Sequence, residues 1–106
     1  MTDYIQVITT TATHDEAEII ARALVEERLA ACTQIVGPIT SIYRWEGQIE
    51  TSQEYQCWAK SRVELFAQIE AAIHRLHPYQ VPEILAIPVL EGSDDYLKWL
   101  EGEVKR

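Results

Sequence analysis

The chain has 106 residues, of which 47% are hydrophobic and 25% are charged, and its formal net charge is −8. This length predicts a single domain over residues 1–106 with one modest core. The excess of acidic residues argues against nucleic acid and anionic membranes as partners, since both require a basic protein surface.

The first two predicted elements are a short strand and a helix. Residues 4–10 are rich in β-branched side chains, which predicts a strand. Thr13 and Glu16 have the spacing of a capping box, in which each side chain bonds the backbone N–H of the other residue. A helix is predicted from His14 to about Arg28, because apolar residues follow at helical spacing: Ala17, Ile20, Ala21, Leu24 and Val25.

A long hairpin is predicted next. Its first strand covers residues 29–45 and is interrupted at Gly37-Pro38, because proline cannot donate a ladder hydrogen bond. Gly47 lies at the reversal, where a positive φ is needed, and the second strand covers about residues 49–60. Strands average about 5–6 residues. Such long arms should therefore extend past a small core and be covered by another copy of the chain.

Side chains of the second arm alternate between two faces. The face that suits packing under helices carries Tyr55, Cys57 and Ala59. The opposite face carries Glu54, Gln56, Trp58 and Lys60. An indole among charged and amide groups has two interpretations: this face is partly buried against another subunit, or Trp58 lies on an open surface.

The second half of the chain predicts a helix, a connector, a strand and a last helix. Ser61 and Glu64 have the spacing of a second capping box, and the apolar stripe that follows predicts a helix. Two prolines then make residues 77–82 a stiff, extended connector. A strand is expected over residues 83–90, and Ser93 is placed to cap a helix whose apolar residues are Tyr96, Leu97, Trp99 and Leu100.

The resulting order of elements is β-α-β-β-α-β with a further helix at the C-terminus. This order predicts an α+β fold of the ferredoxin-like type, in which a four-stranded antiparallel sheet has helices on one face. No helix is left to cover the other face of the sheet, which again indicates self-association.

The connector places an imidazole, a phenol and a carboxylate close together, on His77, Tyr79 and Glu83. Polar groups at fixed positions suit a binding site. The same groups would also suit a turn that merely caps the ends of the helix and the strand. Cys32, His77 and Glu83 are candidate ligands for copper or zinc, provided that folding or assembly brings them together.

Cys32 and Cys57 are too few for a disulfide framework, which indicates a reducing cytoplasm. With the hairpin reversing near Gly47, Cys57 should lie opposite residues 36–37, so the two thiols should not form one site. Each cysteine could equally be a small buried apolar residue. We also expect neither a signal peptide nor a membrane span, since the chain has no suitably long apolar stretch.

The sequence lacks signatures of catalysis. It contains no glycine-rich phosphate loop, no Cys-x-x-Cys motif and no Asp-rich calcium loop. Cys32 has no basic neighbour in the sequence that could activate it as a nucleophile. We therefore expect a binding protein rather than an enzyme, with no required cofactor.

Several segments together resemble one known family: Glu27–Cys32, Ile42–Gly47, Glu54 with Lys60, His77–Ile84 and Tyr96–Trp99. They are similar to the CutA divalent-cation tolerance family, and the match spans nearly the whole chain. The resemblance implies a ferredoxin-like subunit in a tight homotrimer, similar in architecture to the PII signalling proteins, with hairpins that reach across to neighbours. It also implies a link to tolerance of divalent ions and, as in some members, copper binding.

The resemblance is carried over by position. Cys32 matches the family's thiol, and the family's polar and aromatic positions match Tyr43, Trp45, Glu54, Lys60, His77, Tyr79 and Glu83. This chain departs from the usual pattern at Cys57, at Ser61 in place of threonine and at Gln34 in place of a frequent asparagine. The resemblance therefore does not imply that Cys57 is a ligand.

Two functions are predicted ahead of a third, an enzyme with a site between subunits, for which the sequence offers no nucleophile–base signature. In the first, a cytoplasmic homotrimer binds copper or a similar divalent ion weakly, with Cys32 as the soft ligand and with His77 and Glu83 in a cleft between subunits. In the second, a PII-like signalling or scaffold trimer binds a small metabolite or a protein in these clefts. The residues expected to line the clefts are Tyr43, Trp45, Glu54, Trp58, Lys60 and Tyr79.

Overall fold

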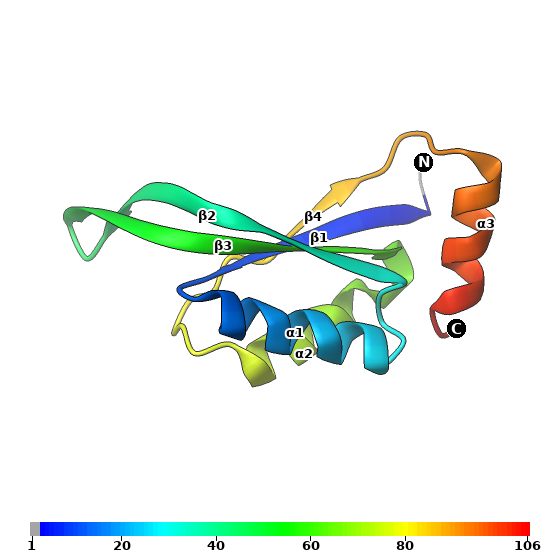
Figure 1. Cartoon of the computed structure of the whole chain (residues 1–106), viewed down its shortest axis with the longest axis horizontal. Coiled ribbons are helices and arrows are strands. Elements are labelled where there is room, and N and C mark those ends of the chain that lie inside the picture. Colours follow the sequence, from blue (N-terminus) through cyan, green and yellow to red (C-terminus); the bar gives the residue numbers. More distant parts are fainter. Residues whose placement is uncertain (1–2) are drawn as a thin grey trace.

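The computed structural model describes residues 3–106, in which an antiparallel four-stranded sheet has helices α1 and α2 on one face (Figure 1). The strands are β1 (Tyr4–Thr11), β2 (Cys32–Trp45), β3 (Gln48–Arg62) and β4 (Leu85–Pro88), in the order β2-β3-β1-β4. The helices are α1 (His14–Glu26), α2 (Phe66–Leu76) and α3 (Asp94–Glu103), with a 3-10 turn over Val63–Leu65. The predicted α+β class and order of elements are confirmed.

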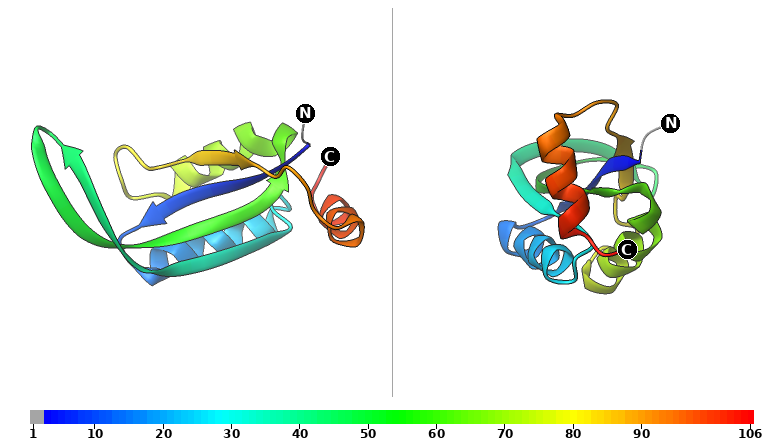
Figure 2. Two further views of the ribbon diagram at one scale, coloured as in Figure 1. Left: turned by 90° about the horizontal axis from the view of Figure 1, so that it is seen from above. Right: turned by 90° about the vertical axis from the view of Figure 1, so that its right-hand side faces the viewer.

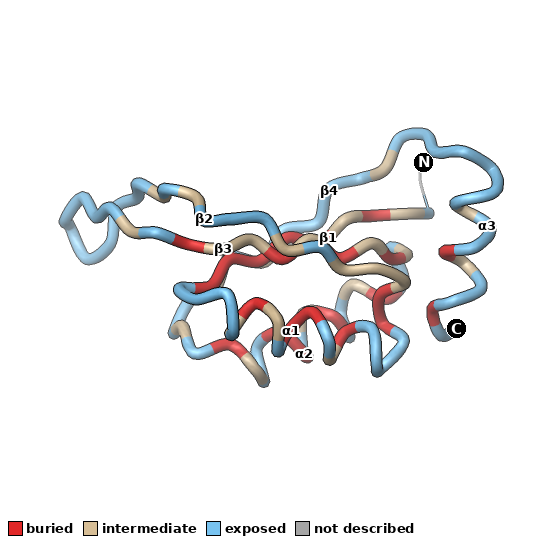
Figure 3. The backbone as a smooth tube through the Cα atoms, viewed as in Figure 1, coloured by how far each residue is buried: buried red, intermediate tan, exposed pale blue. Residues whose placement is uncertain are grey.

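The core lies between the sheet and the helices α1 and α2, where buried segments face one another (Figure 3). β1 contributes Ile5 and Val7, and β3 contributes Cys57 and Ala59, the latter pair as the alternation along the second hairpin arm predicted. The helical core residues are Ala17, Ile20, Ala21, Leu24, Ile69, Ala72 and Ile73. Among residues 3–106, no helix covers the opposite face of the sheet, because α3 lies across one end of the sheet (Figure 2).

One of the two predicted capping boxes is present. The Glu16 N–H donates to Thr13 Oγ1 at 3.1 Å, and the Thr13 N–H donates to Glu16 Oε1 at 3.3 Å. The second box is wrong, because Ser61 belongs to β3 and its buried hydroxyl donates to the Leu29 carbonyl. Helix α1 also ends earlier than expected, since Arg28 has a φ of 58°, which does not fit a right-handed helix.

The hairpin of β2 and β3 has arms of 14 and 15 residues and projects beyond the helices, so that the molecule measures 44 × 25 × 22 Å (Figure 1). Glu46 and Gly47 both have positive φ at the reversal, as two-residue hairpin loops require. The register shifts between Val36 and Ile39, at the predicted interruption. This bulge places Cys57 opposite Ile35 rather than opposite residues 36–37.

Two other predicted boundaries change. β2 begins at Cys32 rather than at residue 29, because Leu29 and Ala30 turn into the core instead. β4 covers only half of the expected residues 83–90, and all four of its residues are exposed. The Ser93 cap is confirmed, since Ser93 Oγ accepts the Tyr96 N–H at 3.4 Å. No helix within residues 3–106 combines the length and apolar character needed to span a bilayer.

Candidate ligand-binding site

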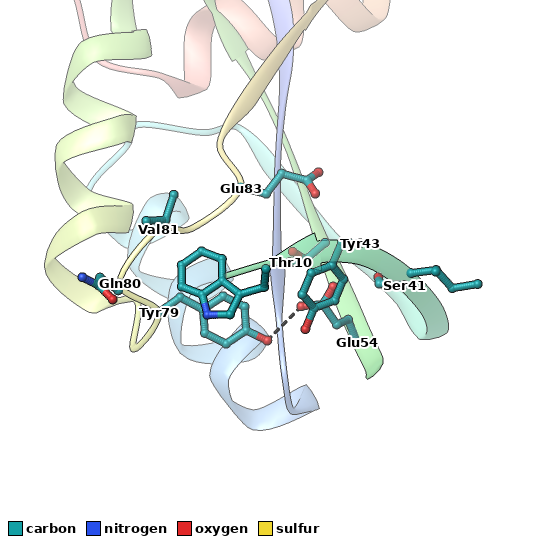
Figure 4. A pocket seen from close by; sticks show the side chains of 10 residues that line it. Thr10, Ser41, Tyr43, Glu54, Tyr79, Gln80, Val81 and Glu83 are labelled. Carbon is teal, nitrogen blue, oxygen red and sulfur yellow. Dashed lines mark hydrogen bonds between the residues drawn. The ribbon is translucent and has the colours of Figure 1, made fainter. Parts of the chain in front are cut away.

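A cavity of about 560 Å³ opens between the hairpin and the connector that joins α2 to β4 (Figure 4). We call it the hairpin cavity. It is lined by Thr10, Ser41, Ile42, Tyr43, Trp45, Glu54, Tyr79, Gln80, Val81 and Glu83. The structure thus brings together five of the predicted site residues, namely Tyr43, Trp45, Glu54, Tyr79 and Glu83. Pockets of this size commonly hold small organic ligands.

Glu54 is the most deeply buried charged group of the hairpin cavity, with a 6% exposed residue surface. It lies on the sheet face opposite Cys57, as predicted from the alternation along β3. Its Oε2 accepts a hydrogen bond from the Tyr79 hydroxyl at 2.8 Å, drawn as the dashed line in Figure 4. Burial and then this bond raise the pKa of Tyr79. The phenol therefore stays protonated at neutral pH and remains a donor to Glu54.

His77 lies behind Tyr79 and is buried, with 8% of its surface exposed. Its Nε2 donates to the Thr10 carbonyl at 2.7 Å, since a carbonyl can only accept, and its Nδ1 accepts the Tyr79 N–H at 3.1 Å. Both ring nitrogens are therefore engaged with the backbone in the neutral ring. In this arrangement His77 positions Tyr79, and a metal ion could bind His77 only by displacing one of the two hydrogen bonds.

Glu83 lies at the edge of the hairpin cavity, where its residue is exposed (Figure 4). Partial burial of its carboxyl group, and secondly the negative charge of Glu54, raise the pKa of Glu83. The two carboxyl groups thus interact across the cavity. The charge of Glu54 disfavours ionisation of Glu83, and a bound cation would relieve this repulsion.

Cys32 lies far from the hairpin cavity. It pairs with Lys60, which is six residues from Glu54 along β3, and this separation is about 20 Å at about 3.3 Å per residue. Folding of one chain therefore does not bring Cys32 to His77 and Glu83, and a site with these three ligands stays a prediction for the assembled protein. The Cys32 thiol lies near the Tyr96 hydroxyl, where burial and then Cys32 raise the pKa of Tyr96.

Cys57 faces the helices and is 1% exposed, on the side of the sheet opposite Cys32. Burial raises the pKa of its thiol to about 12. The thiol is therefore a poor nucleophile and a poor ligand at neutral pH, since both roles need the thiolate. The prediction that the two cysteines do not share a site within one chain is confirmed.

Trp58 and Lys60 lie on the same sheet face as Glu54 but do not line the hairpin cavity. The Trp58 Nε1–H donates to Gln56 Oε1 at 3.2 Å, and Lys60 Nζ donates to Gln34 Oε1 at 2.6 Å. Both residues are partly exposed in the single chain. Their predicted place between subunits stays a prediction.

Within the described part of the chain, one cluster has the spacing of metal ligands. His14, Asp15 and Glu18 offer atoms within 4.8 Å of one another at the start of α1. Glu18 already pairs with Arg22 at 2.8 Å, and acidic side chains are ordinary at a helix N-terminus. We therefore assign no site to this cluster.

The sequence reasoning missed five residues of the hairpin cavity: Thr10, Ser41, Ile42, Gln80 and Val81. Gln80 and Val81 lie within the connector that was singled out, and Ser41 shares the alternation of Tyr43 along β2. These positions gave a usable signal. Thr10 gave none, because only the tertiary fold brings the end of β1 next to the connector.

The chain is similar to known proteins over most of its length. Residues 5–103 match the family described as CutA1 divalent ion tolerance protein. The divalent-cation tolerance protein CutA of Thermus thermophilus is 47% identical over 94 residues, which are 89% of this chain and 91% of that protein. Protein CutA of Mus musculus is 43% identical over 84 residues, which are 79% of this chain and 48% of that longer protein.

Solved structures extend the likeness to the fold. The crystal structure of CutA from Xylella fastidiosa superimposes with a TM-score of 0.94 at 38% identity, covering 98% of this chain and 100% of that chain. The resemblance noted in the sequence is thereby confirmed over nearly all of the chain. The chain belongs to the CutA1 divalent ion tolerance protein family.

Proposed function

We propose that this divalent-cation tolerance family member binds a small polar molecule or a divalent ion in the hairpin cavity, without catalytic turnover. The observation that carries the proposal is the buried carboxylate of Glu54, which faces an open cavity and is fixed by Tyr79 at 2.8 Å. Burying a carboxylate is costly. A cavity that keeps one in a fixed orientation suits the binding of a ligand.

Copper remains the second candidate ligand, with Cys32 as the soft donor. The family description supports it, since it names divalent ions. Because Cys32 lies about 20 Å along the sheet from Glu54, the thiol and the carboxylates would be separate sites in one subunit. Assembly would have to join Cys32 to His77 and Glu83 of neighbouring chains. No resident cofactor is required in either case.

We further propose that the protein is a cytoplasmic homotrimer of PII-like architecture. The uncovered parts of the hairpin and of β4 support self-association, because they expose large apolar side chains: Ile42 is 70% exposed, Ile49 68% and Leu85 56%. Two free cysteines suit a reducing compartment. The net charge of −8 supports the absence of nucleic-acid and membrane partners.

Binding without turnover is supported by the composition of the hairpin cavity. Its described lining residues include no Cys, His or Lys, so the thiol, imidazole and amine groups that often serve as nucleophiles or bases are missing there. The comparisons name a tolerance protein and mention no reaction. A signalling or scaffold role, in which ligand binding changes the contacts of the trimer, would need no chemistry at the site.

Calorimetric titration with copper tests where an ion binds. The wild type is compared with Glu54→Gln, which removes the buried charge, and with Cys32→Ser, which removes the soft donor. Weaker binding by Glu54→Gln alone would place the ion in the hairpin cavity, and weaker binding by Cys32→Ser alone would place it at the thiol. Affinities equal to that of the wild type in both variants would remove copper from both sites.

Light scattering tests the proposed homotrimer. It should report a particle of three times 12.2 kDa.

A further inference from the structure

Within one chain, no cationic side chain of the described residues balances the charge of the hairpin cavity. None of its ten lining residues is Lys, Arg or His, whereas two are glutamates. None of the ion pairs among residues 3–106 includes Glu54 or Glu83. Buried carboxylates are usually paired with a cation. The cavity therefore lacks the positive partner that its two acidic groups would favour.

Aromatic rings form much of the remaining wall. Tyr43, Trp45 and Tyr79 all line the hairpin cavity, and the faces of such rings carry partial negative charge. A cation near a ring face is stabilised, and more strongly where water is excluded. An anion would be repelled, because it would lie near two carboxylates and ring faces with no cationic side chain in the lining. The combination of acid and rings thus selects for positive charge.

The size and the donor types distinguish an organic cation from a bare metal ion. The cavity volume of about 560 Å³ is in the range of pockets for organic molecules. Copper and zinc sites in proteins usually include sulfur or imidazole ligands, and the lining has neither. A hard ion could use the carboxylates, but an ion that keeps its hydration shell makes less use of three aromatic rings than an organic cation does.

We infer that the hairpin cavity binds a small organic cation, a primary amine or a quaternary ammonium compound whose apolar part packs on the rings. The inference rests on the proposed function, because it names the class of ligand for the same cavity. Glu54 is the charge partner: its Oε2 is held by the Tyr79 hydroxyl, so its Oε1 is the oxygen left to face the positive charge of the ligand. Glu83 supplies the second charge at the edge.

The support behind Glu54 favours a fixed site. Tyr79 holds the carboxylate through its hydroxyl and is itself held through its N–H by His77 Nδ1. His77 in turn donates to the Thr10 carbonyl of β1. This series of hydrogen bonds anchors the acceptor oxygen to the sheet. A charged acceptor held in advance loses little freedom when the ligand binds.

The test uses four probes with the full-length protein: 2-phenylethylamine as a primary amine, phenyltrimethylammonium as a quaternary one, 2-phenylethanol as a neutral compound and 3-phenylpropionate as an anion. Binding is followed by the NMR signal of the Trp45 indole N–H, which Trp45→Phe identifies. Magnesium and copper chlorides are titrated in the same way. We expect the amine or the quaternary compound to bind at least about tenfold more tightly than the neutral and anionic compounds.

Charge-removing variants then show which carboxylates carry the preference. Glu54→Gln should weaken binding of the cationic probe by about tenfold, while its amide oxygen can still accept from Tyr79. Glu83→Gln should weaken it less, because Glu83 is exposed. Glu50→Gln is the matched control: Glu50 is an exposed carboxylate of β3 outside the lining, and its removal should change the affinity less than twofold.

The outcomes separate this inference from the proposed function. Equal binding of cationic and neutral probes, or preference for the anion, would overturn the organic cation and leave a ligand-binding cavity. Shifts of the Trp45 signal by metal ions alone would do the same and favour an ion. If no probe and no ion changes the Trp45 signal, both proposals fail. Loss of the charge preference in Glu50→Gln but not in Glu54→Gln would also overturn the inference.

Discussion

Tyr79→Phe removes the hydroxyl that holds the buried carboxylate of Glu54 and leaves the ring in place. The two oxygen atoms are 2.8 Å apart, and Glu54 is only 6% exposed, so water cannot easily replace the lost donor. Hydrogen bonds to charged groups contribute about 1.5–3 kcal/mol to stability. We therefore expect the free energy of unfolding to fall by about 2 kcal/mol.

Urea unfolding, followed by circular dichroism, measures this loss. Small proteins lose about 1–3 kcal/mol of stability per molar urea, so a loss of about 2 kcal/mol should lower the midpoint by about 1 M. The protein concentration must be the same for all variants, because subunit association would make the apparent stability depend on it. Combining Tyr79→Phe with Glu54→Gln completes a double-mutant cycle, and its coupling energy reports the pair itself.

Tyr43→Phe is the matched control, since it deletes the same atom from another tyrosine of the hairpin cavity. The Tyr43 hydroxyl is 3.2 Å from Ser52 Oγ on the exposed hairpin, where water can replace the bond. We expect a loss below about 0.5 kcal/mol. If Tyr43→Phe and Tyr79→Phe cost the same, the Tyr79–Glu54 bond is not the special support that the structure indicates.

Three further predictions concern groups around the same fold. In the folded protein, a thiol reagent should label Cys32 and react with Cys57 at least about a hundredfold more slowly, because Cys57 is 1% exposed and burial raises its pKa to about 12; equal rates without denaturant would contradict this. His77→Ala should lower the free energy of unfolding by about 2–4 kcal/mol, measured by urea unfolding, because it leaves a buried backbone donor and a buried acceptor unpaired; a loss below about 1 kcal/mol would disagree. Burial and then Glu54 raise the pKa of Glu83, so its ionisation opposes folding as pH rises through that raised value; Glu83→Gln should therefore gain stability relative to the wild type at pH 7 compared with pH 4, and the reverse change would refute the sign.

Local patterns in the sequence predicted the fold well where the signal was itself local. The box of Thr13 and Glu16 is formed as expected, because both partners lie within four residues. Ser61 and Glu64 have the same local spacing, but their predicted box does not form. The Ser61 hydroxyl donates instead to a tertiary partner, the Leu29 carbonyl. Cys57 pairs with another residue than predicted, because the bulge at residues 36–39 shifts the register of the hairpin. The sequence predicted an interruption there but not its effect on the register.

The candidate site was predicted only in part, because the sequence shows local groups but not their tertiary partners. Glu54, Tyr79 and Glu83 were identified as polar groups on rigid elements, and the fold brings them to one cavity. The sequence could not show that both nitrogens of His77 are bound to the backbone, because one partner is on β1, 67 residues away. Nor could residue types alone place Cys32 relative to the connector, since that distance depends on strand register.

The bulge near residues 36–39 divides the hairpin into two mechanical parts. On one side the arms belong to the sheet; on the other they pair only with each other, and an isolated two-stranded ribbon is easily deformed. Tyr43 and Trp45 lie on that compliant ribbon, whereas Tyr79 is tethered to the body of the protein. The cavity therefore has one wall on a deformable ribbon and one wall on the rigid body of the protein. A neighbouring molecule that contacts the tip of the hairpin should therefore change the affinity of the cavity for its ligand.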